Sequence, residues 1–115
     1  MAKSSKARIA SLGDPVLSEI TDRLVRAYSP ERVYLFGSMA RGDAGQDSDY
    51  DILLVVGDDA GPDALSARPA YDALWGLRAS ADVHIWPRRK FESRLHLKAS
   101  LPATVVREGK LLYAA

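Results

Sequence analysis

The chain has 115 residues, of which 47% are apolar, and a formal net charge of +1 at pH 7. This length suits one folded domain, and the near-neutral charge gives no general case for direct nucleic-acid binding. The absence of cysteine excludes disulfides and thiolate metal sites and fits a cytoplasmic protein, and no apolar run reaches the ~20 residues of a membrane span. We expect a flexible tail over 1–13 and a single domain over 14–115.

The first half of the chain predicts one helix and two strands. Asp14-Pro15 is a typical helix start, and apolar residues recur at helical spacing from there to Tyr28. The β-rich run 32–36 predicts a strand. The nearly continuous apolar run 50–56 predicts a second strand that is buried on both faces.

The second half predicts more helices and strands in alternation. We expect helices over 63–79, 88–98 and 102–107, a strand over 82–86 and a last edge strand over 111–113. This order predicts an α/β (α+β) fold, in which helices flank a small mixed β-sheet.

Two aspartates, Asp49 and Asp51, open the second predicted strand. Residues two apart on a strand share a face, so these carboxylates would repel each other unless a cation lay between them. Mg²⁺ is usually held by one or two carboxylates together with substrate phosphates. The pair therefore indicates a metal site, although a turn cap followed by an exposed strand start would give the same pattern.

A Gly-Ser turn follows the first predicted strand. Ser38 is a suitable N-cap for a short helical turn over 39–41, and the amides of such a turn attract phosphate oxygens. Gly37 would let a ligand approach the backbone, and Ser38 would add a hydroxyl donor. Arg41 would add a planar, charged guanidinium group that can donate two hydrogen bonds to a phosphate. An ordinary connection between a strand and a helix explains the same residues equally well.

Asp82 begins the third predicted strand. If this strand pairs with the 50–56 strand, Asp82 would lie beside the aspartate pair and could complete a metal site or accept a proton from a hydroxyl. A strand-start aspartate without a role is the alternative. His84 shares the predicted face of Asp82, but a lone strand histidine is more often a packed or rim residue. Trp75 and Trp86 are expected in the core or at a partner contact.

The window from Gly37 to Asp51 reads Gly-Ser-x-Ala-Arg-Gly, five residues, and Ser-Asp-x-Asp. It closely resembles the signature of the DNA polymerase β-like nucleotidyltransferase superfamily. Within this superfamily, the chain resembles the minimal nucleotidyltransferase (MNT) domain proteins over roughly residues 15–113. Asp82 falls where that family places its third acidic residue, and the ending 106–113 is also similar.

The resemblance implies a polymerase β-like fold and a role for each matching residue. The carboxylates that ligate two Mg²⁺ ions would be Asp49, Asp51 and Asp82, and Asp82 would also be the base toward the acceptor hydroxyl. The residues that bind the ATP nucleotide would be Gly37, Ser38, Arg41 and Ser48. Arg41 would steady the pyrophosphate or only pair with Asp43 or Asp47. The reaction would be in-line attack on the α-phosphorus of ATP, with pyrophosphate leaving.

The resemblance also implies a partner. In this family the usual partner is a HEPN-domain RNase toxin, and the MNT protein is the antitoxin that transfers AMP to a tyrosine hydroxyl of the toxin. We therefore expect AMP transfer within a hetero-complex or oligomer, because the chain has no room for an acceptor-binding domain of its own. Two alternatives are a small-molecule nucleotidyltransferase of the aminoglycoside-modifying type and an antitoxin that neutralises its partner by contact alone.

Overall fold

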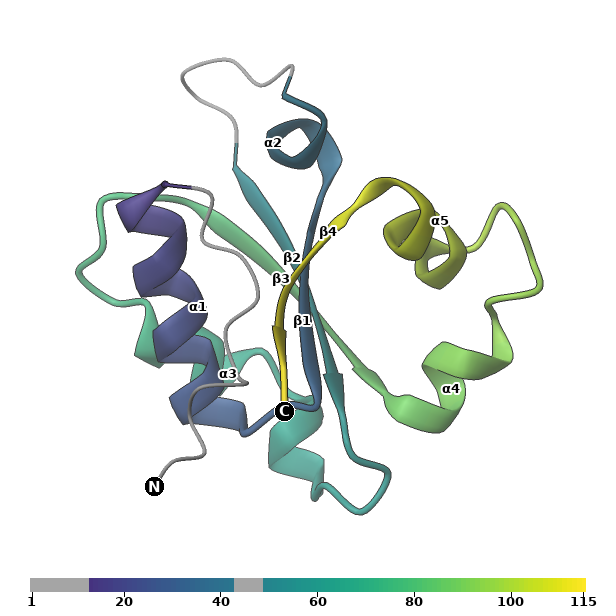
Figure 1. The fold of residues 1–115 in the computed structure, drawn as a ribbon. Helices are drawn as coiled ribbons and strands as arrows, with labels where there is room; N and C mark the ends of the chain where they lie inside the picture. The colour runs from purple at the N-terminus through teal and green to yellow at the C-terminus, as the bar shows by residue number, and fades with distance from the viewer. Residues whose placement is uncertain (1–12, 43–48) are drawn as a thin grey trace.

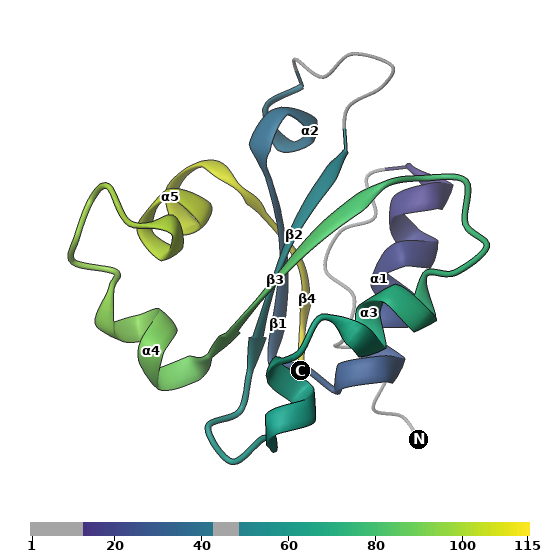
Figure 2. The same ribbon diagram turned by 180° about the vertical axis from the view of Figure 1, so that it is seen from behind.

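The computed structural model describes residues 13–42 and 49–115, which form one four-stranded sheet with helices on both faces (Figure 1, Figure 2). The strand order is β3-β2-β1-β4, and only the β2–β3 pair is parallel. The strands are β1 (Arg32–Phe36), β2 (Tyr50–Val56), β3 (Ala81–Pro87) and β4 (Lys110–Ala114). The predicted mixed sheet and α/β (α+β) class are therefore confirmed.

The helices of the described residues are α1 (Pro15–Tyr28), α2 (Gly37–Arg41), the 3-10 helix η2 (Pro62–Leu65), α3 (Arg68–Ala73), α4 (Arg88–Ser93) and α5 (Leu101–Glu108). The prediction of α1 is confirmed, and α5 extends one residue beyond its predicted range at each end. No helix in the described ranges is long and apolar enough to cross a membrane. The flexible tail expected over 1–13 lies outside the described residues except for its last residue.

The helix predicted over 63–79 is wrong in its length. The chain forms η2 and the short helix α3 instead, with Pro69 in the first turn of α3. Proline lacks an amide N–H and clashes with the preceding turn, so a helix cannot run through this position from residue 63. Tyr71 and Trp75 are exposed, whereas Ala70 is buried and Leu74 and Leu77 pack against the core, so only part of the apolar spacing in this segment marks a buried face.

Two other local predictions also need correction. The helix expected over 88–98 ends at Ser93, and Leu95 and Leu97 beyond it are exposed. A short helix is stable mainly through a buried face, which these residues do not supply. Ser38 is not an N-cap, because α2 already begins at Gly37 and no side chain caps it.

The sheet has a hydrophobic core on each face. Residues 52–56 of β2 are all buried, as predicted for a strand covered on both sides. Ile52 and Leu54 pack in a cluster with α1 and α3, whereas Leu53 and Val55 pack with Phe91 of α4 and with α5. Figure 1 shows these two helix pairs on opposite sides of the sheet. Odd-numbered residues of β2 therefore face α4 and α5.

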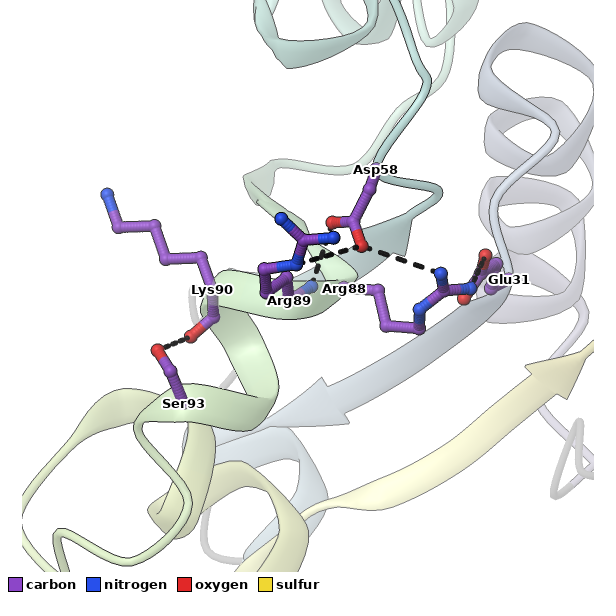
Figure 3. Close-up of polar contacts among 6 residues, drawn as sticks. All are labelled: Glu31, Asp58, Arg88, Arg89, Lys90 and Ser93. Atoms are coloured by element: carbon purple, nitrogen blue, oxygen red, sulfur yellow. Dashed lines mark hydrogen bonds and ion pairs between the residues drawn. The ribbon is translucent and has the colours of Figure 1, made fainter.

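The start of α4 is held by acidic residues from other elements (Figure 3). Arg88 Nη1 donates to Glu31 Oε2 at 2.7 Å, and Arg88 Nη2 lies 3.5 Å from Asp58 Oδ2. The amide of Arg89 donates to Asp58 Oδ1 at 2.9 Å. No side chain of the preceding residue caps this helix, so Asp58 supplies the N-terminal acceptor from a distant loop.

We expect Asp58→Ala to lower the free energy of unfolding by about 1 kcal/mol, the usual cost of losing a helix cap. This corresponds to a decrease of about 4 °C in the melting temperature for a domain of this size. Thermal unfolding followed by circular dichroism measures the effect. Asp59→Ala is the matched control, because Asp59 is exposed in the same loop. Equal melting temperatures for the two variants would contradict the cap.

Asp14 connects α1 to the start of β2. Its Oδ1 accepts hydrogen bonds from the amides of Val16 and Leu17, and its Oδ2 accepts one from the Tyr50 hydroxyl at 2.8 Å. Burial raises the pKa of Tyr50 from 10 to about 12, and the hydrogen bond to Asp14 and the charge of Asp14 act in the same direction.

This pKa shift predicts a loss of stability in alkali. The neutral phenol is favoured in the folded state, so its contribution is complete below pH 10 and is lost as the pH rises from 10 toward 12. We expect Tyr50→Phe to lose less stability over this interval than the original chain, by on the order of 2 kcal/mol. Urea unfolding at pH 8, 10 and 11.5 measures this difference, and parallel curves for the two proteins would refute it.

Candidate active site

Asp51 lies at the centre of the candidate site because of the register of the sheet. It pairs with Phe36, the last residue of β1, and with Asp82 on β3. Asp51 is two residues before Leu53, so its side chain is on the sheet face of α4 and α5. Register partners on adjacent strands share a face, so Asp82 is on the same side. The condition that we set for the position of Asp82, pairing of its strand with β2, is met.

Burial and the charges around Asp51 change the pKa of its carboxyl group. Burial raises the pKa of Asp51, and the charges of Asp82 and Asp49 raise it further. His84 and Arg41 have the opposite effect. Asp49 is exposed and directly precedes β2. The sheet thus brings Asp82 and Asp49 close enough to Asp51 for their charges to disfavour its ionised form.

Gly37 makes room for Asp51. Its φ of +74° lies in the left-handed region, and a Cβ at this position would overlap Oδ2 of Asp51. Only glycine meets both conditions at low cost. The helix α2, which begins at this residue, packs against the ends of β1 and β2. The Gly-Ser turn is therefore built around the Asp51 carboxylate rather than being an interchangeable connection.

Asp82 contacts a histidine on its own strand. His84 Nε2 lies 3.3 Å from Asp82 Oδ2, and the His84 ring also rests against Phe36 with centroids 5.6 Å apart. The prediction that the two residues share a face is confirmed. Within 13–42 and 49–115, no three Asp, Glu or His side chains come together closely enough to form a complete set of metal ligands.

Two other predicted residues border the site. Arg41 is exposed at the end of α2, and its charge lowers the pKa of Asp51. Ser48 lies outside the described residues, as do the two alternative partners suggested for Arg41, Asp43 and Asp47.

Sequence reasoning missed a pocket beside this site. Asp49, Asp82, Tyr71 and Trp75 are among the residues that line a cavity of about 750 Å³ beside α3 and β3. Trp75 was expected in the core or at a partner contact and is 69% exposed. No sequence signal distinguishes such a wall from a core, because apolar residues at helical spacing are typical of both.

Comparison with known proteins identifies the family. A family model described as a nucleotidyltransferase domain matches residues 17–111. The chain belongs to the nucleotidyltransferase domain family. No curated protein matches this nucleotidyltransferase domain.

Three solved structures are similar to this nucleotidyltransferase domain. A toxin-antitoxin complex with AMP-PNP is 26% identical, with a TM-score of 0.56, over 84% of this chain and 72% of that chain. A mutant of the toxin-antitoxin MntA-HpeT is 22% identical, with a TM-score of 0.53, over 83% of this chain and 71% of that one. A Sulfolobus solfataricus protein, provisionally assigned as a nucleotidyltransferase, is 24% identical, with a TM-score of 0.52, over 69% and 70%.

Proposed function

We propose that this nucleotidyltransferase is an MNT-type antitoxin that transfers AMP from ATP to a tyrosine hydroxyl of a HEPN-type partner toxin. The observation that carries the proposal is the position of Asp51, which lies between the Gly37 turn on one side and Asp82 on the other. The similarity to a toxin-antitoxin structure with AMP-PNP, an ATP analogue, supports a toxin as partner and an adenine nucleotide as substrate.

The order of the strands supports a division of roles across the site. Gly37, Ser38 and Arg41 follow β1 and would bind the triphosphate, together with Ser48, which lies outside the described residues. Asp82 is on β3, at the other side of Asp51, and would receive the proton of the acceptor hydroxyl. The acceptor oxygen bonds to the α-phosphorus, the bond from this phosphorus to the bridging oxygen breaks, and pyrophosphate leaves with that electron pair.

The three aspartates offer carboxylate oxygens, the ligand type that a hard divalent cation takes, although in the described part of the chain they are not gathered into a complete set of ligands. Burial raises the pKa of Asp51 and the charges of Asp82 and Asp49 raise it further, and a hard cation with oxygen ligands would relieve that repulsion of the Asp51 carboxylate. We propose that Asp49, Asp51 and Asp82 would hold two Mg²⁺ ions. When bound, Mg²⁺ would supply neutralisation of the charge on the phosphate oxygens.

A labelling experiment tests the proposal. The chain is co-purified with the helical protein encoded by the adjacent reading frame and incubated with Mg²⁺ and ATP labelled at the α-phosphate. We expect the label on the partner, and we expect it to disappear when the acceptor tyrosine is replaced by phenylalanine. A parallel reaction offers kanamycin as the acceptor, and label on kanamycin instead of protein would identify a small-molecule transferase. The reaction is repeated with each of the other labelled nucleoside triphosphates, and no transfer from any of them would contradict the enzymatic function.

A further inference from the structure

One face of the edge strand β3 continues the candidate site away from Asp51. Asp82, His84 and Trp86 alternate along β3 and share the sheet face of Asp51, because Asp82 is its register partner. The side chains of Asp82 and His84 are 63% and 38% exposed, and Trp86 is half-buried. These three side chains form a partly open row, which we call the β3 row.

The far end of the β3 row meets the start of α4. Four residues separate Asp82 from Trp86, so the row is about 13 Å long at the usual rise of a strand. Pro87 ends β3, and α4 begins at the next residue. Nζ of Lys90 on α4 lies 5.7 Å from the centre of the Trp86 ring. The first turn of α4 therefore extends the row.

The far end is positively charged, and the chain balances this charge only in part. Residues 88–98 contain five Lys and Arg residues and one Glu, whereas the whole chain has a net charge of +1. Arg88 is paired with carboxylates from two other elements. The side chain of Arg89 is 88% exposed and lies 3.9 Å from Asp58, and Figure 3 shows Lys90 pointing away from Asp58. Arg89 and Lys90 can therefore contact an acidic group of another molecule.

The two ends of the β3 row thus have opposite charges. Asp49, Asp51 and Asp82 carry carboxylates at the near end, and Arg89 and Lys90 carry cations at the far end. Such a separation of charge steers a partner into one orientation. Acidic residues of the partner are attracted to α4, and an uncharged group is the one that can approach the carboxylates.

This pattern favours a protein segment over a nucleic acid or a small anion. A nucleic acid carries a phosphate on every nucleotide, so a strand that reached Asp82 would be repelled there. A small anion could contact Lys90 but could not span the ~13 Å of the row. A protein segment can have acidic residues at one end and an uncharged hydroxyl at the other. Its side chains would cover His84 and Trp86 between the two ends.

We propose that an extended segment of the partner protein docks along the β3 row, with an acidic residue at Arg89 and Lys90 and the acceptor hydroxyl beside Asp82. Because the row is ~13 Å long, the acidic residue lies at least about four residues from the acceptor residue. The inference rests on the proposed function, since it assigns the surface that binds the partner at that same site.

Zero-length cross-linking of the complex tests the acidic contact. The chain is co-purified with the adjacent-frame partner and treated with a carbodiimide, which joins a lysine amine to a carboxylate in contact with it. We expect mass spectrometry to find a cross-link from Lys90 to an Asp or Glu of the partner. Lys110 is the control, because it is exposed on β4 at the opposite edge of the sheet. A complex that forms without a cross-link from Lys90 would overturn the proposal.

Charge reversal tests the same contact by affinity. Arg89→Glu and Lys90→Glu should each weaken binding of the partner about tenfold at low salt, and the loss should shrink at high salt because ions screen the attraction. Lys90→Arg keeps the charge and should bind like the original chain. Arg26→Glu is the matched control, since Arg26 is exposed on α1, on the other side of the sheet (Figure 1). All of these side chains are exposed, so the melting temperatures should stay close together.

Affinity is measured without nucleotide, which separates this inference from the transfer reaction. Unchanged affinity of both Glu variants would overturn the docking surface even if the chain transfers AMP. Weakened affinity in a chain that transfers no nucleotide would support the docking surface and contradict only the enzymatic function. A single-stranded RNA oligonucleotide is titrated in parallel. RNA binding that Lys90→Glu abolishes, with unchanged affinity for the partner, would assign the surface to nucleic acid and overturn the proposal.

Discussion

Asp51→Asn should abolish nucleotidyl transfer and, in the same protein, raise the melting temperature. We expect transfer to fall at least about a thousandfold, as is common when a central catalytic group is removed. Stability should rise because burial and the neighbouring aspartates raise the pKa of Asp51, so the ionised carboxylate is less favourable in the folded chain than in the unfolded chain. The expected increase is on the order of 3 °C.

The pH dependence of this gain follows from the direction of the pKa shift. The ionised side chain costs stability at neutral pH, and the cost shrinks as the pH falls through the raised folded pKa and is gone below the ordinary value of 3.8, where the carboxyl is protonated in both states. Melting curves at pH 7 and pH 3.5, recorded with EDTA, measure the difference between the two proteins. Asp59→Asn is the control for removal of a charge. If Asp51→Asn melts below the original chain at pH 7, the repulsion that we infer is absent.

Gly37→Ala should reduce transfer by about a hundredfold or more while the domain still folds. The new Cβ would overlap Oδ2 of Asp51, so either the carboxylate or the turn must move. A displacement of about 1 Å in a catalytic group can cost about two orders of magnitude in rate. Steady-state transfer from labelled ATP to the partner measures this loss.

Gly13→Ala separates the steric effect from the cost of the backbone conformation. Gly13 has a φ of +73°, close to the +74° of Gly37, but nothing lies within 4 Å of a Cβ at this position. Both variants should lose about 1 kcal/mol of stability through the left-handed conformation, and only Gly37→Ala should lose activity. Full activity of Gly37→Ala would show that the close approach to Asp51 does not matter.

The sequence predicts the elements whose signals are local. Asp14-Pro15 and the apolar spacing after it predict α1, and the unbroken apolar run predicts β2, because capping and burial on both faces each leave a direct trace in the sequence. That Asp51 and Asp82 lie next to each other could be predicted only on the condition that their two strands pair. It depends on which strands pair, and pairing is a property of the whole sheet.

The rest depends on contacts between distant residues. The start of α4 is anchored on Asp58, which is thirty-one residues before Arg89, and sequence spacing carries no sign of this contact. The pocket wall formed by Tyr71 and Trp75 looks like a buried helix face, since hydrophobic periodicity does not report what covers a surface. The overlap that forbids a side chain at Gly37 also appears only after the fold has placed Asp51 there.

The bond between Tyr50 and Asp14 has a consequence for the two aspartates on either side of that tyrosine. Alternation along the strand turns the Tyr50 ring toward α1, away from the face of Asp51. The hydrogen bond to Asp14 thus fixes the beginning of β2 to α1, on the sheet face opposite the Asp51 side chain. Ligands can bind and leave on the face of Asp51 while the hydrogen bond between Tyr50 and Asp14 still holds the start of β2 in place.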